Sequence, residues 1–191
     1  LVCAAPVIAS YFTYYVIRPE GRRNFGELVE PQRPMPAEAL VVALDGQPRK
    51  LGELRDQWLL VSVGAAACDA DCRNNLYLQR QMREAMGREK ERLDWVWLVS
   101  DDAALPADIA PALEQATVLR ADDAMLAQWL APQAGHGLSE HLYVVDPQGQ
   151  WMMRFPARMD GAGATQARRD LERLLRASAS WDQPGRAKEQ P

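Results

Sequence analysis

The chain has 191 residues, of which 48% are hydrophobic and 25% are charged. These values are typical of a globular fold, and the length leaves room for one ordinary domain with extensions. The net charge of −4 provides no basic field of the kind that attracts nucleic acid. With only 3 cysteines, the sequence also excludes a small scaffold held together by several disulfides.

The N-terminal stretch, residues 1–17, carries no charged side chain and is followed by a basic segment that begins at Arg18. About 17 apolar residues is the lower limit for a helix that spans a bilayer, and tyrosines suit its interfacial ends. The sequence therefore predicts a transmembrane anchor over residues 1–17. An uncleaved signal-peptide core or an amphipathic helix is the alternative, and no small-residue cleavage site precedes the arginines.

The rest of the chain divides into a tether, a domain and a tail. Residues 18–39 contain four prolines and little periodicity, which predicts an extended tether. A folded domain is expected over residues 40–179. Residues 180–191 are polar and contain prolines, and we expect them to form a disordered tail.

Within the expected domain, strand-like and helix-like segments alternate. Uncharged apolar runs suit buried strands, while apolar side chains three and four residues apart predict amphipathic helices. A turn sequence between the last two strands predicts a hairpin. This succession indicates an α/β fold with a mixed sheet. In chain order we expect strand 40–44, strand 58–63, helix 74–90, strand 94–99, helix 107–114, helix 122–130, strands 141–145 and 150–155, and helix 165–176.

The segment Cys68-Asp69-Ala70-Asp71-Cys72 places two thiols between a buried strand and a long helix. Two soft ligands at such a turn suit a redox disulfide, a bound metal ion, or both. On a regular helix, residues four apart have Cβ atoms about 5–6 Å apart, whereas a disulfide needs about 3.8 Å. Cys68 is therefore expected in the irregular turn and Cys72 near the first helical turn. The helix N-terminus favours a Cys72 thiolate, the two carboxylates oppose it, and Asp71 is a candidate N-cap.

A buried strand, a turn with two thiols, a helix, a later hairpin and a terminal helix together describe a thioredoxin-like architecture. The chain resembles the Sco/SenC group of membrane-tethered thioredoxin-fold proteins in its apolar N-terminus, its proline-containing tether and its Cys68-x-x-x-Cys72 motif. The sequence from Tyr143 to Gly149, YVVDPQG, is similar to that family's Tyr-Leu-x-Asp-Pro-x-Gly hairpin. The resemblance implies a thioredoxin-like mixed sheet flanked by helices, with an N-terminal transmembrane helix.

The resemblance also implies a function in the assembly of cytochrome c oxidase. Sco/SenC proteins are associated with copper delivery to, or thiol reduction at, the oxidase's copper site, so the expected partner is its copper-bearing subunit. In that family two thiolates and a histidine bind copper, which assigns Cys68 and Cys72 to the site. The family's histidine position falls on Leu138, so the expected third ligand is His136, or alternatively His141.

A Sco-like role places the chain in the inner membrane as a single-pass protein whose soluble domain faces the periplasm, where a disulfide persists. The residues alone leave two other functions open, and they leave open whether the chain is an enzyme. The off-register histidines favour a metal-free thiol–disulfide oxidoreductase, although no proline immediately precedes the strand that begins at His141. The other alternative is a non-catalytic, thioredoxin-like interaction module in which Cys68 and Cys72 form a structural disulfide.

Overall fold

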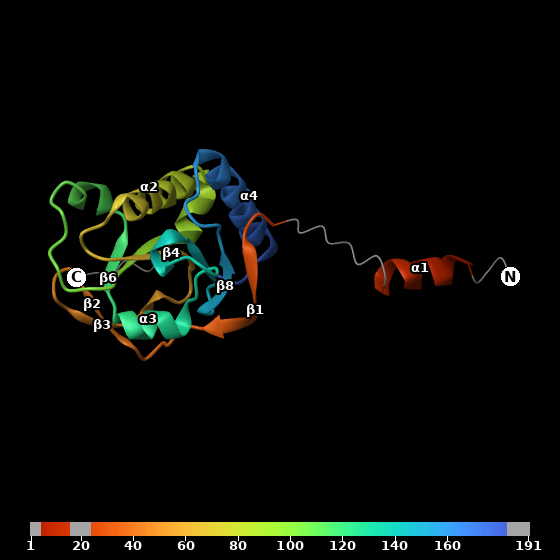
Figure 1. Cartoon of the computed structure of the whole chain (residues 1–191), viewed down its shortest axis with the longest axis horizontal. Coiled ribbons are helices and arrows are strands. Elements are labelled where there is room, and N and C mark those ends of the chain that lie inside the picture. Colours follow the sequence, from red (N-terminus) through yellow and green to blue (C-terminus); the bar gives the residue numbers. More distant parts are fainter. Residues whose placement is uncertain (1–4, 16–23, 183–191) are drawn as a thin grey trace.

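An eight-stranded sheet forms the centre of the fold (Figure 1). The computed structural model describes residues 5–15 and 24–182. The strands are β1 (Glu27–Pro34), β2 (Leu40–Ala43), β3 (Pro48–Lys50), β4 (Trp58–Gly64), β5 (Leu93–Val99), β6 (Thr117–Arg120), β7 (Tyr143–Val145) and β8 (Gln150–Arg154). Their order in space is β1-β8-β7-β4-β5-β6-β2-β3. Strands β4, β5 and β6 are parallel and the other neighbours are antiparallel, so the sheet is mixed, as predicted.

Helices cover both faces of the sheet (Figure 1). The α-helices are α1 (Ala5–Tyr15), α2 (Ala70–Glu84), α3 (Asp123–Trp129) and α4 (Gly161–Ala177), and the 3₁₀ helices are η1 (Leu51–Leu54), η2 (Gly87–Arg92), η3 (Ala110–Leu113) and η4 (Leu138–Glu140). Alternate residues of β4 point to opposite layers. Leu60 lies in the apolar cluster that contains residues of α2 and α4, whereas Leu59 lies in the cluster that contains Leu126 of α3. The resulting three-layer arrangement is the predicted thioredoxin-like α/β fold.

The long apolar segments are where the sequence predicts, and the short ones differ. The strands expected at 58–63 and 94–99 are β4 and β5, and the expected hairpin is β7 and β8. The helix expected over 107–114 is wrong, because only the 3₁₀ turn η3 forms there. Pro111 lies inside that segment and has no N–H to continue an α-helix. Strands β1, β3 and β6 were not predicted.

Strand β1 lies within residues 18–39, the range predicted to be a tether. It pairs with β8, so it forms one edge of the sheet. Just before it, the buried Gly26 N–H donates to Oδ2 of the buried Asp170 on α4 at 2.8 Å. The folded region therefore begins before Leu40, since prolines are tolerated in an edge strand and do not exclude one.

The start of the range predicted to be a disordered tail, residues 180–191, packs against the domain. The Trp181 ring stacks on Trp58 with centroids 6.3 Å apart. Arg92 donates to both carboxylate oxygens of Asp182, at 2.6 and 2.8 Å. Residues 183–191 lie outside the described residues.

The N-terminal helix α1 covers 11 of the residues predicted to be a transmembrane anchor. Of the helices in residues 5–15 and 24–182, none combines the length and the apolar character needed to cross a bilayer. Residues 1–4, 16 and 17, which belong to the predicted anchor, are outside the described part of the chain. The transmembrane portion of the predicted fold class is thus not confirmed.

The contact between Asp170 and Gly26 predicts that β1 contributes to stability. Asp170→Ala leaves the buried Gly26 N–H without its acceptor and is expected to lower the free energy of unfolding by about 1–3 kcal/mol. Denaturant titration of the purified protein measures this change. Arg169→Ala, at the neighbouring exposed position of α4, should change it by less than about 0.5 kcal/mol. Equal stability of the Asp170 variant and the wild type would contradict the assignment of β1 to the folded core.

Candidate functional site

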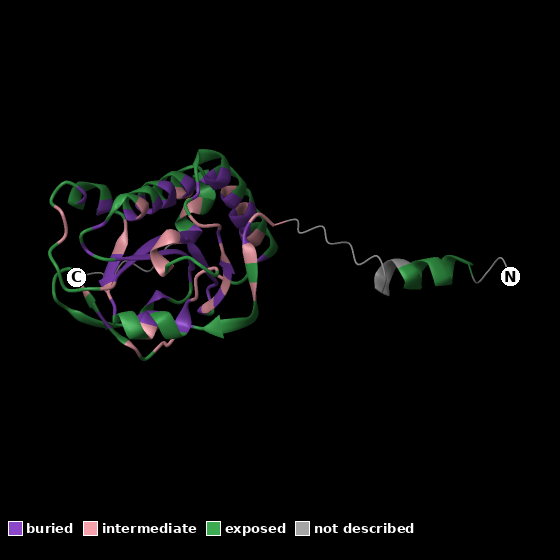
Figure 2. Ribbon diagram, in the orientation of Figure 1, coloured by how far each residue is buried: buried purple, intermediate pink, exposed green. Residues whose placement is uncertain are grey.

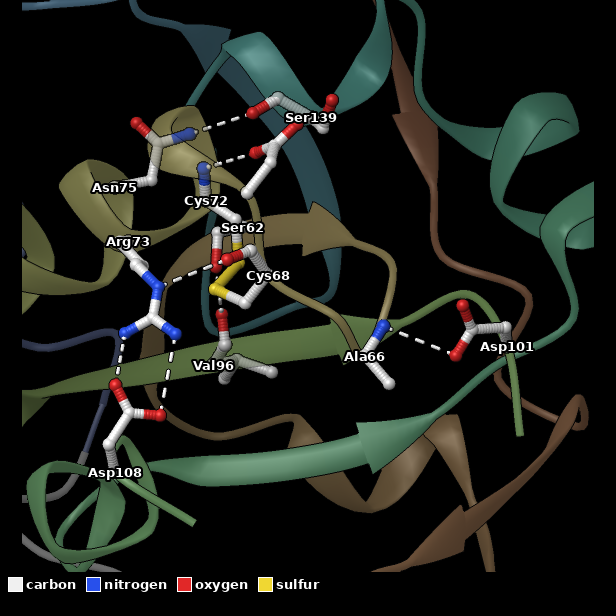
Figure 3. The surroundings of a disulfide bond; sticks show 11 residues. Ser62, Ala66, Cys68, Cys72, Arg73, Asn75, Val96, Asp101, Asp108 and Ser139 are labelled. Atoms are coloured by element: carbon white, nitrogen blue, oxygen red, sulfur yellow. Dashed lines mark hydrogen bonds and ion pairs between the residues drawn. A yellow bond between two sulfur atoms is a disulfide. The ribbon is translucent and has the colours of Figure 1, made fainter. Parts of the chain in front are cut away.

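Cys68 and Cys72 form a disulfide where β4 ends and α2 begins (Figure 3). Cys68 lies in the turn before the helix, and its N–H donates to Ala65 O at 3.0 Å. Its φ of +48° is in the left-handed region, which is uncommon for a residue with a side chain. Cys72 is the third residue of α2. The structure thus confirms the expected division, with one cysteine in the irregular turn and the other in the first helical turn.

The N-cap of α2 is Asp69, not the predicted Asp71. Asp69 has an extended backbone, and its Oδ1 accepts the N–H of Cys72 at 2.9 Å. Asp71 lies inside the helix, and its carboxylate is 3.2 Å from Nε of Arg158. The cap and the disulfide therefore hold the same residue, Cys72, by its backbone and by its side chain.

Arg73 holds the turn from the opposite side. Its Nε donates to Cys68 O at 3.2 Å, while its guanidinium donates to both oxygens of Asp108 at 2.7 and 3.4 Å (Figure 3). The hydrogen bond from Arg73 lowers the pKa of the Asp108 carboxyl and keeps it ionised. Because both side chains are largely exposed, this ion pair adds little to stability. Its effect is to orient Arg73 over the backbone of Cys68.

The disulfide itself is buried, and it follows β4, a central strand that is buried along its whole length (Figure 2). Cys68 is 2% exposed and Cys72 is 5% exposed. They share an apolar cluster with Trp95 and Trp97 of β5. A partner protein therefore reaches either sulfur only if the turn between β4 and α2 moves.

A pocket of about 220 Å³ adjoins this cluster between α2 and η3. Its floor is apolar and includes Leu76, Trp95 and Ile109, which also belong to the cluster around the disulfide. Arg73 and Arg80 contribute to its lining. A side chain or ligand in this pocket would therefore contact the same apolar residues that pack around the cysteines.

His141, the alternative metal ligand predicted from the sequence, is fully buried and uses both ring nitrogens. Nδ1 lies 2.8 Å from Phe155 O, and Nε2 accepts the N–H of Gln133 at 3.2 Å. These contacts assign a neutral ring with its proton on Nδ1. Burial lowers the pKa of His141, which favours the same neutral form. His141 thus ties two loops to the hairpin and has no free nitrogen for a metal ion.

His136, the predicted third ligand, lies in an exposed loop. Its Nδ1 is 3.3 Å from Oε2 of Glu140, and its ring meets that of His141 edge-on. The following turn η4 lies beside α2, because Asn75 Nδ2 donates to Ser139 O at 2.9 Å. The position expected to carry the family's histidine is thus close to the helix of Cys72, but its residue is Leu138.

The predicted set of Cys68, Cys72 and a histidine is not assembled in the described residues. Within residues 5–15 and 24–182, no group of three or more His, Cys, Asp or Glu side chains could hold a metal ion. A three-ligand copper site of the Sco type therefore does not fit the observed arrangement. The groups that the structure does bring together are the two bonded cysteine sulfurs, which can act as a disulfide or, after reduction, as a dithiol.

The buried, neutral His141 predicts a pH-dependent stability. The unfolded chain protonates this ring below about pH 6.5, whereas the folded protein keeps it neutral to lower pH. The free energy of unfolding should therefore fall as the pH drops from about 7 to 5, and it should fall less steeply in His141→Gln. Denaturant titrations across this range measure the slope. An unchanged slope in His141→Gln would refute the assignment.

Comparisons with known proteins agree with the fold. No curated protein matches the chain. The copper-bound structure of yeast Sco1 has a TM-score of 0.59 at 13% identity, covering 75% of this chain and 94% of that one. Copper-bound ScoI from Bradyrhizobium japonicum has a TM-score of 0.53 at 18% identity, covering 72% and 97%. A thiol:disulfide interchange protein from Bacteroides sp. has a TM-score of 0.56 at 15% identity, covering 78% and 92%.

These likenesses confirm the predicted resemblance to Sco proteins, and at such identities they show a shared fold. A sequence profile gives the family itself. The profile described as "Transmembrane-like, thioredoxin-like, C-terminal domain" matches residues 58–178, which include β4, the Cys68–Cys72 turn and α4. The chain therefore belongs to the family of transmembrane-like, thioredoxin-like C-terminal domains.

Proposed function

We propose that the chain exchanges disulfides with a partner protein through Cys68 and Cys72. The observation that carries the proposal is the disulfide at the turn between β4 and α2, with neither histidine placed as a third ligand. A helix N-terminus next to one of the sulfurs supports thiolate chemistry there. The likeness in fold to a thiol:disulfide interchange protein is consistent with this function.

In the proposed reaction, the reduced chain passes two electrons to a disulfide of the partner. One thiolate attacks a partner sulfur, which forms a mixed disulfide and releases the other partner sulfur as a thiolate. The second cysteine of the pair, as a thiolate, then attacks the mixed disulfide. The products are the Cys68–Cys72 disulfide and a partner dithiol, which takes up the protons that the pair loses.

The burial of both sulfurs requires the turn to open during this exchange. The turn between Ala65 and Asp69 belongs to neither a strand nor a helix. Side chains hold it at two points, where Ala66 N–H donates to Asp101 Oδ1 at 3.1 Å and where Arg73 donates to Cys68 O. Both contacts are partly buried, and each is made by an exposed side chain, Asp101 or Arg73, so a partner that docks there can displace them.

A second candidate function is the binding of Cu(I) by the two thiolates of the reduced pair. Soft thiolates suit Cu(I), and two neighbouring sulfurs can bind it without a histidine. The likeness in fold to the copper-bound structures of yeast Sco1 and Bradyrhizobium ScoI supports this second candidate function. In this form of the hypothesis, His136 and His141 are not ligands.

The proposed setting follows the Sco resemblance. Residues 1–17 would anchor the chain in the inner membrane, with the folded domain in the periplasm. The proposed partner is the copper-bearing subunit of cytochrome c oxidase. The uncharged N-terminal sequence and the Sco-like fold support this setting, and fractionation of cells followed by protease accessibility of the folded domain tests it.

The exchange proposal predicts an accessible reduction potential. Equilibration with thiol–disulfide buffers, followed by alkylation and mass measurement, should reveal one two-electron transition between about −180 and −300 mV. Cys72→Ser should abolish the transition, whereas Cys3→Ser should leave it unchanged. A potential well below about −300 mV would instead identify a structural disulfide, as in the non-catalytic alternative.

The copper hypothesis predicts binding that depends on the sulfurs alone. Anaerobic titration of the reduced protein with Cu(I) should give one ion per chain, and Cys72→Ser should abolish it. His136→Ala and His141→Ala should each bind with unchanged affinity. Weaker binding by the His136 variant would show that copper recruits this loop into a three-ligand site, and absence of binding by the wild type would remove copper from the proposed function.

A further inference from the structure

Trp97, on the central strand β5, has a buried N–H group that lacks a partner. Its side chain is fully buried, and Nε1 makes no hydrogen bond within the described residues. Buried donors are nearly always paired in folded proteins. Neither the packing of the fold nor the transfer of electrons between the two disulfides requires an unpaired N–H at this position.

The unpaired N–H of Trp97 and the sulfur of Cys72 border the same position, the one that a side chain at Gly64 would occupy. A Cβ atom built on Gly64 would be 3.6 Å from Cys72 Sγ and also 3.6 Å from Trp97 Nε1. Trp97 pairs in register with Ser62, two residues before Gly64, so Trp97 and Gly64 lie on the same face of neighbouring strands. The absent side chain of Gly64 leaves a small space that both the sulfur and the indole nitrogen border.

The charged groups that face the turn are already paired in the disulfide form. On α2, Asp69 accepts the Cys72 N–H, and Arg73 is bound to Asp108 from the segment before η3. Asp71 is bound to Arg158. After β5, Asp101 accepts the N–H of Ala66. The indole N–H of Trp97 is therefore a donor near Cys72 that has no partner within the described residues, and it is uncharged.

We propose that Trp97 donates a hydrogen bond to the thiolate of Cys72 when the disulfide is reduced. A disulfide sulfur is a weak acceptor, whereas a thiolate is a charged one and forms a stronger bond with an N–H. The indole has no partner in the oxidised protein because its acceptor forms only on reduction. Trp97 is thus a positioning residue that stabilises the nucleophilic form of Cys72, and the inference deepens the proposed function by identifying what favours the reduced state.

The test uses the full chain with Cys3→Ser and Cys68→Ser, which leaves Cys72 as its single thiol. The ultraviolet absorbance of the thiolate, followed against pH, gives the midpoint of its ionisation. Trp97→Phe removes the N–H and should move this midpoint to higher pH, with about a tenfold loss of thiolate at neutral pH. The rate of alkylation by iodoacetamide at neutral pH should fall by a similar factor.

Gly64→Ala provides a second variant that keeps the indole. Its methyl group would lie in ordinary van der Waals contact with both Cys72 Sγ and Trp97 Nε1, so it fills the space that both atoms border without a clash. The ionisation midpoint should move in the same direction as in Trp97→Phe. Trp95→Phe is the matched control, because Trp95 is a buried indole of the same strand and the same apolar cluster, and it should retain the wild-type midpoint.

An unchanged midpoint in both Trp97→Phe and Gly64→Ala would overturn the proposal, as would an equal change in Trp95→Phe. If Trp97→Phe does not fold, the result with Gly64→Ala decides. The measurement is made on a single thiol and does not require exchange with a partner. A structural disulfide of very negative potential would therefore refute the proposed function and leave this inference to be decided by the ionisation midpoints.

Discussion

Strand β4 is buried along all seven of its residues, and the position of the disulfide depends on this burial. Because helices cover both faces of the sheet, β4 cannot shift without exposing apolar side chains on one of them. Its last residue, Gly64, lies under the sulfur of Cys72, and the next residues turn directly into α2. The rigid strand and the capped helix fix both ends of a short turn, and Cys68 lies within it. The thiol chemistry is thereby held at the end of the central strand.

The sequence predicts best those structural features that depend on the local pattern of residues. Apolar runs identify β4, which carries no charge, and β5, whose one charged residue is Asp94 near its start, because a strand buried on both faces is almost continuously apolar. The disulfide geometry was also predictable, since four-residue spacing excludes a pair placed wholly within a regular helix. By contrast, the edge strand β1 depends on pairing with β8, more than a hundred residues away in the chain. No local pattern in a proline-containing segment indicates such a contact.

The candidate site likewise has features that the sequence predicts and features that only the folded structure reveals. The position of Cys68 and Cys72 follows from the sequence, but the state of the histidines does not. His141 is excluded as a free ligand by the backbone atoms of Phe155 and Gln133, which only the fold brings to it. The unpaired N–H of Trp97 cannot be predicted from the sequence either, because the sequence indicates only a buried aromatic residue at this position. One available signal was overlooked: Asp69 stands three residues before Cys72, the spacing of an N-cap and the amide it binds.

The left-handed backbone conformation of Cys68 links the redox state of the cysteine pair to the conformation of the turn. For a residue with a side chain, this conformation costs about 1–2 kcal/mol, and three bonds offset that cost in the oxidised protein. They are the disulfide, the hydrogen bond to Ala65 and the contact from Arg73. Reduction removes the only covalent one of the three, so the turn becomes free to relax. In the proposed exchange, a partner would then distinguish the two oxidation states by the shape of the turn, before it contacts either sulfur.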